Sequence, residues 1–277
     1  MIDCLLDALL DTIKLIPYLL VTFLLLEFVE HKVSNKMHKK LAKINKTGPI
    51  VGGILGGFPQ CGFSAMASNL YTGGIITKGT LIAIFLSTSD EMLPIMLGEK
   101  VKIELVLSII LFKVVVGIII GLLVDLIFRS KIDNKKIEDM CDEEHCHCKN
   151  GIFVSSLIHT LKTALFVLIA NVVIGLGIYY IGEDNLAKLL HNKNIFVYFL
   201  SSLIGLIPNC ASSIVLTEVY LSGLITMGVL ISGLLTGSGI GILLLFKNNK
   251  NIKENLLILS IIYFVGVFIG FIVDLFI

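Results

Sequence analysis

The chain has 277 residues, of which 56% are hydrophobic and 16% are charged, and its formal net charge is +1. This composition lies outside the usual range of soluble globular domains and predicts an integral membrane protein, because several apolar stretches are long enough to cross a bilayer. The near-zero net charge excludes the basic field of a nucleic-acid-binding protein. The six cysteines do not form the pattern of an extracellular disulfide framework.

The first apolar stretch predicts a membrane helix over residues 9–29. No Lys or Arg precedes it and Asp3, Asp7 and Asp11 stand around its start, so we expect a retained helix rather than a cleaved signal peptide. By the positive-inside rule the next loop is cytoplasmic, which places the N-terminus outside. That loop carries Lys32, Lys36, Lys39, Lys40, Lys43 and Lys46.

Two interrupted apolar elements come next, over residues 50–71 and 75–97. Pro59, Gln60 and Cys61 interrupt the first element, and a polar run from Ser87 to Glu91 interrupts the second. The lysine-rich loop before these elements is placed inside and the turn near residue 99 outside, so the chain between them must cross the membrane an odd number of times. We therefore expect a re-entrant hairpin in the first element and a discontinuous crossing helix in the second, with three very short spans as the alternative. A full helix over residues 103–128 follows.

A linker over residues 129–151 begins with four basic residues and is expected in the cytoplasm. The second half then predicts helices that begin near residues 153, 196, 224 and 256. Its loop at residues 182–194 has balanced charge and is placed outside, whereas a last loop with three lysines at residues 247–253 is placed inside. The C-terminus is therefore expected outside.

The two halves are related by a constant offset of 149 residues, which pairs Pro59 with Pro208 and Asp125 with Asp274. The offset indicates a duplicated unit, and equivalent loops on opposite sides indicate inverted copies. The predicted fold is an all-α integral membrane protein with two inverted repeats, each with full transmembrane helices, a re-entrant hairpin and a discontinuous helix. We divide the chain into a first membrane repeat (1–128), a cytoplasmic Cys/His-rich linker (129–151) and a second membrane repeat (152–277).

Polar residues gather around the helix breaks of both copies. Paired breaks in inverted repeats are typical of a transporter site near the membrane midplane. Asp90 and Glu91 are the residues most disfavoured in a bilayer; their oxygens suit a divalent ion such as manganese, whereas Cys61 and Cys210 add soft thiolates. The predicted ion-binding residues are Gln60, Cys61, Ser64, Asn69, Ser89, Asp90, Glu91, Asn209, Cys210, Ser213 and Glu218.

Each of these features has a structural alternative. Pro and Gly also kink ordinary membrane helices. Asp90 and Glu91 also suit a helix N-terminus that lies nearer the outer surface. Cys61 and Cys210 also suit small core positions, because buried cysteine packs well.

Lys113 lies about ten residues into the helix predicted over residues 103–128, where the second copy has Ile262. A lysine at that depth predicts an ion pair with Asp90, Glu91 or Glu218. Exchange of its proton or partner on cation binding would be the coupling step of an antiporter. The alternative is a lysine that snorkels to the interface.

The linker ends in a dense set of metal ligands: Cys141, His145, Cys146, His147 and Cys148. Their spacing fits no zinc-finger template, but thiols and imidazoles on one short segment bind soft or borderline metals. On the cytoplasmic side these thiols are reduced. The linker therefore predicts capture of metal from the cell interior, hence export, and an incidental polar linker is the alternative.

Four motifs carry a family resemblance: Pro-Gln-Cys-Gly-Phe-Ser from Pro59, the Ser-Thr-Ser-Asp-Glu-Met-Leu-Pro run ending at Pro94, His-Cys-His-Cys ending at Cys148, and Ile-Pro-Asn-Cys ending at Cys210. Together they resemble the bacterial family of ten-helix heavy-metal exporters, whose members are described as arsenic efflux permeases or manganese transporters. The resemblance covers nearly the whole chain. It implies ten segments, whereas the pattern above gives six spans and two hairpins.

We therefore expect a secondary active transporter that exports a divalent heavy metal, manganese first, across the bacterial cytoplasmic membrane by alternating access. Protons or Na⁺ would be the coupling ion, and neither a further cofactor nor an enzymatic activity is expected. The expected partners are the lipid bilayer and the transported ion, without nucleic acid, and a homodimer is the oligomer considered.

Two other functions compete with this expectation. The first is a metalloid or small-anion permease, in which Cys61 and Cys210 bind trivalent arsenic; Asp90 and Glu91 argue against anions because they would repel them. The second is an intramembrane enzyme that uses Cys61 or Glu218 chemically. No His or Lys base stands beside Cys61 in the sequence, so nucleophilic chemistry is disfavoured.

Overall fold

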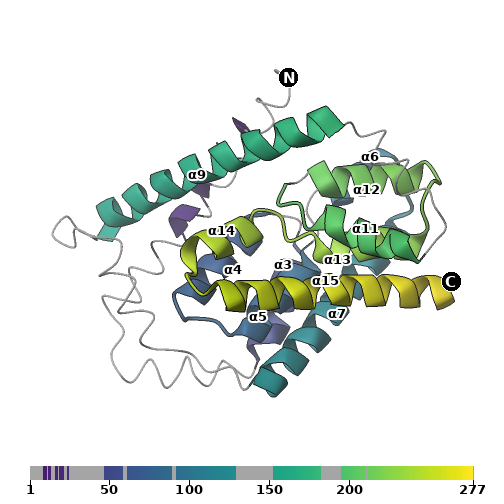
Figure 1. Ribbon diagram of the computed structural model, residues 1–277, viewed down its shortest axis with the longest axis horizontal. Coiled ribbons are helices and arrows are strands. Elements are labelled where there is room, and N and C mark those ends of the chain that lie inside the picture. Colours follow the sequence, from purple (N-terminus) through teal and green to yellow (C-terminus); the bar gives the residue numbers. More distant parts are fainter. Residues whose placement is uncertain are drawn as a thin grey trace.

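A computed structural model describes residues 9–10, 12–13, 16–17, 19–21, 24, 47–58, 61–88, 92–128, 152–181, 195–209 and 211–276. Over these residues the secondary structure is helical and contains no strand, which confirms the predicted all-α class. The first half contains α3 (Gly48–Gly56), α4 (Cys61–Thr72), α5 (Lys78–Ser87), α6 (Met92–Gly98) and α7 (Ile103–Phe128). The long helix α9 (Ile152–Ile181) then leads into the second half (Figure 1).

The second half repeats this series of helices. It contains α11 (Phe196–Gly205), α12 (Ala211–Leu221), α13 (Met227–Thr236), α14 (Gly241–Asn248) and α15 (Ile252–Phe276). When the first series is shifted by 149 residues, each helix boundary falls within one residue of its counterpart. The offset seen in the sequence is therefore also an offset of secondary structure.

The helices differ in length in a way that matters for a membrane protein. Among the described residues, four helical stretches are long and apolar enough to cross a membrane: Lys78–Gly98, Ile103–Phe128, Met227–Asn248 and Ile252–Phe276. The first and third are α5 with α6 and α13 with α14, each taken across its break. In contrast, α3, α4, α11 and α12 have 9, 12, 10 and 11 residues. Such helices are roughly 14–18 Å long, about half the hydrocarbon core.

The helix breaks lie where the sequence predicts them. α3 gives way to α4 across residues 57–60, and α5 gives way to α6 across residues 88–91. At the end of α5 the hydroxyls of Ser87 and Thr88 turn back onto the carbonyls of Ala83 and Ile84, at 2.7 Å each. These hydroxyls satisfy carbonyl groups at a helix end that is buried in protein.

The course of α3 and α4 follows from the residues beside α5. A Cβ atom on Gly48 would meet Thr80 at the start of α5, and one on Gly56 would meet Ser87 at its end, so α3 runs parallel to α5. α4 then returns, because Thr72 is joined to the start of α5 by a short turn at residues 73–77. α3 and α4 together thus begin and end at the same end of the molecule.

Contacts between the helix ends also fix the directions of the long helices. Lys78, at the start of α5, pairs with Glu254 in the first turn of α15. Asp125, near the end of α7, accepts a hydrogen bond from the N–H of Gly79, also at the start of α5. We call this the Glu254 end of the molecule. Since α7 ends where α15 begins, the two helices run in opposite directions (Figure 1).

The other end of the molecule holds the start of α13. Asp274, near the end of α15, accepts hydrogen bonds from the N–H of Gly228, at 2.7 Å, and from the hydroxyl of Thr226. We call this the Asp274 end. α5 therefore starts at the Glu254 end and α13 starts at the Asp274 end, so these matching helices also run in opposite directions.

The two halves pack against each other reciprocally. α4 packs on α14 and α12 packs on α6, and these pairs are counterparts of each other under the offset. α5 packs on its own counterpart, α13. α5 and α13 form the hub, because every residue from Gly79 to Ser87 and from Gly228 to Thr236 is buried.

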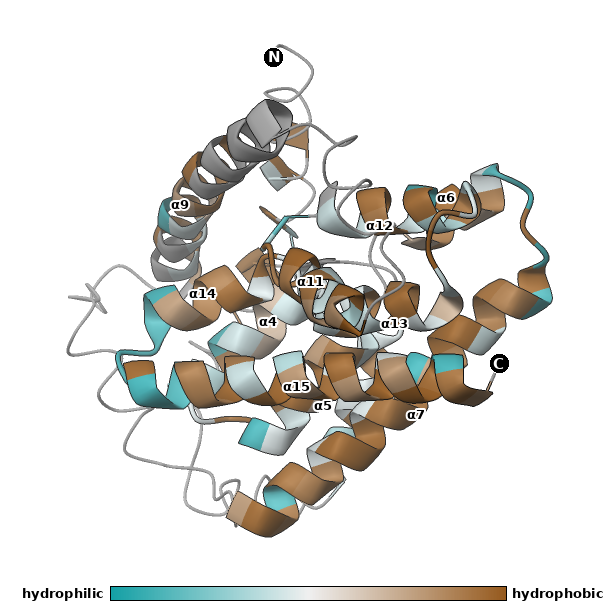
Figure 2. Ribbon diagram, turned by 45° about the vertical axis from the view of Figure 1, so that its right-hand side comes forward, coloured by the Kyte–Doolittle hydropathy of each residue, from teal (hydrophilic) through white to brown (hydrophobic). Residues whose placement is uncertain are grey.

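The long helices pack closely on the hub through glycine. A Cβ atom on Gly79 would lie 2.1 Å from the carbonyl oxygen of Gly121, and one on Gly228 would lie 2.2 Å from that of Gly270. Small residues at such crossings let membrane helices approach closely. The outward faces of α7 and α15 are apolar instead (Figure 2), with Leu111 65% and Phe268 64% exposed, as lipid contact requires.

Candidate functional site

The side chain of Lys113 lies where the two broken helices end. Lys113 comes from the middle of α7 and is 1% exposed. Its Nζ donates hydrogen bonds to the carbonyl oxygen of Leu234, at 2.7 Å, and to that of Thr88. Thr88 caps the C-terminal end of α5, and Leu234 lies in the last turn of α13. One buried amino group therefore joins matching helix ends from both copies.

The breaks themselves make these carbonyls available. The last carbonyls of a helix have no partner within it. At the end of α13 the N–H of Ser238 bonds to the carbonyl of Thr236, at 2.9 Å, so it does not continue the helical pattern back to Leu234. Helix C-termini carry partial negative charge and stabilise a nearby cation. A buried ammonium is strongly disfavoured without such partners, so Lys113 and the two breaks form one unit.

The side chain of Lys113 is directed into the protein. Its Nζ points to the helix breaks in the middle of the chain's long helices and not to either end. The matching residue in the second copy, Ile262, is also fully buried, at 0% exposure. The buried charge is therefore a feature of one copy only.

Buried hydroxyl groups line the contact between α4 and α14, beside the break in the second copy. Ser68 donates a hydrogen bond to the carbonyl of Gly241, at 2.6 Å, and a Cβ atom on Gly241 would lie 2.9 Å from that of Ser64. Ser64 was predicted as a site residue, and it lies at this contact with 0% exposure. Ser238, between α13 and α14, is also fully buried, and its hydroxyl has no hydrogen-bond partner among the described residues.

Other predicted site residues lie at different places in the fold. The side-chain oxygen of Asn69 accepts a hydrogen bond from Asn248 at 2.7 Å, toward the Glu254 end. Asn69 stands eight residues after Cys61, about 12 Å along α4 from the break. Glu218, its counterpart, is exposed in the last turns of α12. Asn209 precedes α12 and is partly buried, and Ser213 lies in its first turn at 8% exposure.

Several predicted site residues lie outside the part that the structure describes. They are Gln60, Ser89, Asp90, Glu91 and Cys210, together with the linker ligands Cys141, His145, Cys146, His147 and Cys148; the side chain of Cys61, the first residue of α4, is also outside it. Within the described residues, no group of three or more His, Cys, Asp or Glu side chains comes together to hold a metal ion.

The offset paired Asp125 with Asp274, but the sequence gave no partner for either residue. Asp125 accepts hydrogen bonds from the hydroxyl of Thr77, at 2.6 Å, and from the N–H of Gly79, at 2.8 Å. Asp274 makes the same two contacts in the second copy, with Thr226 and Gly228. Each carboxylate thus anchors the N-terminus of a half-helix. Both copies contain a Thr-x-Gly motif followed by an Asp at the same spacing, and this repeated pattern could have predicted the contacts.

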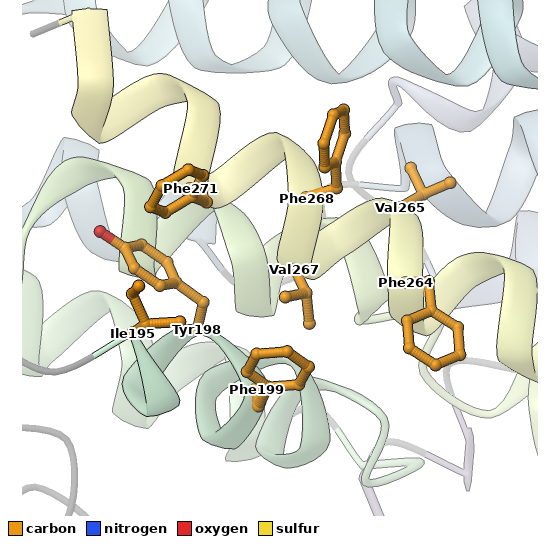
Figure 3. Close-up of a pocket in the computed structure, with 8 residues that line it drawn as sticks. All are labelled: Ile195, Tyr198, Phe199, Phe264, Val265, Val267, Phe268 and Phe271. Atoms are coloured by element: carbon orange, nitrogen blue, oxygen red, sulfur yellow. The ribbon is translucent and has the colours of Figure 1, made fainter.

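An apolar groove lies between α11 and α15 (Figure 3). Its walls are mostly aromatic: Tyr198 and Phe199 come from α11, and Phe264, Phe268 and Phe271 come from α15. No predicted ion-binding residue lines the groove. Its chemistry suits hydrocarbon and offers no ligand for a metal ion.

The chain was compared with known protein families, curated proteins and solved structures. A family model described as "Putative, 10TM heavy-metal exporter" matches residues 1–179 and 154–277, which together span the whole chain. The chain belongs to this exporter family. No curated protein matches it. No solved structure matches it either.

Membership in the heavy-metal exporter family indicates that the fold lies in a membrane. An exporter acts across a membrane, so the chain is a multi-pass membrane protein and its apolar helices are membrane helices. Membership also confirms the resemblance carried by the Pro59 and Cys210 motifs and supports metal efflux rather than catalysis.

Proposed function

We propose that this member of the exporter family is a secondary active transporter that exports a divalent heavy metal, manganese first, by alternating access. The observation that carries the proposal is the pairing of two broken helices, α5 and α13, whose C-terminal ends share Lys113. Broken membrane helices from inverted repeats form the central ion sites of many transporters.

The proposed membrane topology follows the directions of the helices. The Glu254 end carries Lys78, Lys247, Lys250 and Lys253, whereas the turn at the Asp274 end balances two lysines with two glutamates over residues 99–104. The positive-inside rule makes the Glu254 end cytoplasmic. The repeats are then inverted across the membrane, α3 with α4 and α11 with α12 are re-entrant hairpins, and α15 ends outside.

This topology also accounts for the ten segments in the description of the family. Six crossing segments would be the helix predicted from the sequence over residues 9–29, then α5 with α6, α7, α9, α13 with α14, and α15. The four half-length helices α3, α4, α11 and α12 bring the number to ten. A count of ten apolar segments and a fold of six spans with two hairpins are thus compatible.

The proposed cargo site lies at the break between α5 and α6. Thr88, which accepts a hydrogen bond from Lys113, stands two residues before Asp90 and three before Glu91. Carboxylate, hydroxyl and carbonyl oxygens suit a hard or borderline divalent ion. The metal-binding residues of the linker would deliver the ion from the cytoplasm.

Coupling follows from charge in a low-dielectric site. A divalent cation that binds near Lys113 repels its ammonium group and favours loss of its proton. When the cation leaves on the outside, Lys113 regains a proton and the carbonyls of Thr88 and Leu234 hold it again. One cycle would exchange metal for protons, with Na⁺ as the alternative coupling ion.

The experiment replaces Lys113 and uses the second copy as its control. Lys113→Met removes the charge, and Ile262→Met places the same side chain at the matching buried position. We expect Lys113→Met to abolish metal uptake driven by a pH gradient in everted vesicles while metal binding to purified protein persists. Ile262→Met should keep more than about half of the wild-type rate, since hydrophobic swaps of similar volume are tolerated. Unchanged pH-driven transport by Lys113→Met would refute the coupling role.

The cargo is tested separately by offering manganese, zinc and arsenite to the same vesicles. Transport of manganese that is lost in Asp90→Asn supports the proposal. Transport of arsenite alone would instead support the metalloid permease, in which Cys61 and Cys210 are the candidate ligands.

A further inference from the structure

A polar cluster at the Glu254 end joins the two repeats directly. The hydroxyl of Tyr71 donates a hydrogen bond to Oε1 of Glu254 at 2.6 Å, and Nζ of Lys78 lies 3.0 Å from the same oxygen. Beside them, Nδ2 of Asn248 donates to Oδ1 of Asn69 at 2.7 Å. Tyr71, Lys78 and Asn69 belong to α4 and α5, whereas Glu254 and Asn248 belong to α14 and α15. Every one of these contacts therefore crosses from one repeat to the other.

The Asp274 end does not repeat this cluster. The offset of 149 residues matches Lys78 with Met227 and Glu254 with Leu105, so neither charge has a charged counterpart. Met227 and Leu105 lie instead in an apolar cluster with Val101 and Tyr220. Two-fold related copies would place equivalent contacts at both ends. The polar cluster is thus a specialisation of one end.

The polar cluster closes the Glu254 end of a seam that leads to the helix breaks. The seam is the contact between α4 and α14: Ser64 and Ser68 meet Gly241 near the break, and Asn69 meets Asn248 near the Glu254 end. Separation of α4 from α14 would open this seam along its length. A path would then run from the Glu254 end to the break beside Ser238 and Lys113.

The seam also contains a group that favours opening. Nδ2 of Asn69 is buried and has no hydrogen-bond partner among the described residues. A buried donor without a partner is destabilising, and it gains a hydrogen bond when water reaches it. The contacts of Glu254 favour the closed seam, while this unpaired donor lowers the free energy needed to open it.

We propose that Glu254, with Tyr71 and Lys78, is the latch of a cytoplasmic gate between α4 and α14. The latch is closed in this structure, and its opening admits the metal ion from the cytoplasm to the site at the helix breaks. The apolar cluster at the Asp274 end, where α6 packs on α12, would then form the outer gate. The gate rests on the proposed transport function, but its opening can be measured without knowledge of the cargo.

Access to the seam is measured at position 68. Ser68 is 0% exposed and bonded to Gly241, so Ser68→Cys places a small reporter between the latch and the break. A membrane-impermeant thiol reagent is added to everted vesicles, and labelling at position 68 is followed by mass spectrometry. Chymotryptic cleavage after Phe63 separates position 68 from the native Cys61. In the otherwise wild-type chain we expect slow labelling.

Loss of the latch should speed this labelling. Glu254→Gln removes the charge that both partners bind, and Lys78→Met installs the residue of the second copy. Because hydrogen bonds to a charged group are the stronger ones, we expect each change to raise the labelling rate roughly tenfold. Glu104→Gln is the matched control, because Glu104 is the acidic residue in the first turn of α7, as Glu254 is in α15. It should leave the rate unchanged.

The outcomes separate the gate from the transport proposal. Faster labelling in both variants, with monodisperse protein on size exclusion, supports the gate even if manganese is not the cargo. Unchanged labelling in both variants overturns the gate, although metal efflux by the wild type would still stand.

A cross-link provides a second route if Glu254→Gln fails to fold. In Asn69→Cys with Asn248→Cys, a thiol cross-linker should hold the seam closed and stop transport, and a cleavable linker should restore it on reduction. Full transport by cross-linked protein would overturn the proposal.

Discussion

The two copies of the repeat agree in their scaffold and differ in their charges. Both have helix boundaries that match within one residue, the same glycine contact between hub and long helix, and the same aspartate anchor at the start of the broken helix. Only the first copy has Lys113 at mid-helix and Lys78 at the start of the hub. Packing geometry constrains both copies alike, whereas a single transport path needs each charged group once.

The anchors show why the broken ends of α5 and α13, and not the starts of these two helices, are where we expect the hub to move. Asp125 holds the start of α5, and Asp274 holds the start of α13, each with a backbone and a hydroxyl contact. The opposite ends of α5 and α13 are instead held together by the side chain of Lys113. A change in the state of Lys113 therefore acts on the two helix ends that have no aspartate anchor.

The largest effect on stability is expected where the scaffold is most alike. Gly79→Ala and Gly228→Ala each place a Cβ atom against a backbone oxygen, at 2.1 Å and 2.2 Å. Since backbone must move to make room, we expect each change to lower the free energy of unfolding by about 3 kcal/mol. Unfolding by SDS titration of purified protein measures this. Gly98→Ala is the control, because a Cβ atom there meets nothing within 4 Å. If Gly79→Ala and Gly228→Ala lowered the free energy of unfolding by unequal amounts, the two glycine contacts would differ in energy despite their matching geometry.

Much of this scaffold could be predicted from residue type and spacing. Proline, glycine and hydroxyl residues interrupt apolar stretches for local reasons, so the breaks at residues 57–60 and 88–91 were predictable. The constant offset then predicted the same breaks in the second copy. These are features that a short stretch of chain, or its repeat, determines without knowledge of distant contacts.

The partners of the charged groups could not be predicted in the same way. Lys78 and Glu254 meet across 176 positions, and Lys113 takes a carbonyl of Leu234 from the other copy. Carbonyl oxygens occur at every residue, so no residue type marks the partner of Lys113. Asn69 was grouped with the break because it is a polar residue in an apolar stretch. Its side chain bonds Asn248 toward the Glu254 end, a partner that the sequence did not indicate.

An intermediate effect is expected at the two aspartate anchors. Asp125→Asn and Asp274→Asn each replace charged hydrogen bonds to the start of a half-helix with neutral ones, so we expect each to lower the unfolding free energy by about 2 kcal/mol. Asp274 also accepts a hydrogen bond from Tyr198 at 2.7 Å, so its loss should be the larger. The same SDS titration tests this. If Asp125→Asn lowered the unfolding free energy more than Asp274→Asn, the hydrogen bond from Tyr198 would not be the contact that sets the order of the two anchors.

The two anchors should also act independently. They hold opposite ends of the molecule and share no partner, so the double variant should lose the sum of the single losses to within about 0.5 kcal/mol. A much smaller combined loss would indicate that the starts of α5 and α13 are coupled through the hub. The two aspartate anchors would then stabilise one cooperative unit and not two separate helices.

The smallest effect is expected from two buried serines of the second copy. Ser232 shares a hydrogen bond with Ser202 at 2.7 Å and donates to the carbonyl of Tyr198 at 2.8 Å, whereas Ser238 has no partner among the described residues. Ser232→Ala should lower the unfolding free energy by about 1 kcal/mol, and Ser238→Ala should leave it unchanged or raise it slightly, because an unpaired buried hydroxyl is itself destabilising. A loss from Ser238→Ala as large as that from Ser232→Ala would show that the Ser238 hydroxyl has a hydrogen-bond partner in the membrane, which would add it to the bonded polar groups at the break.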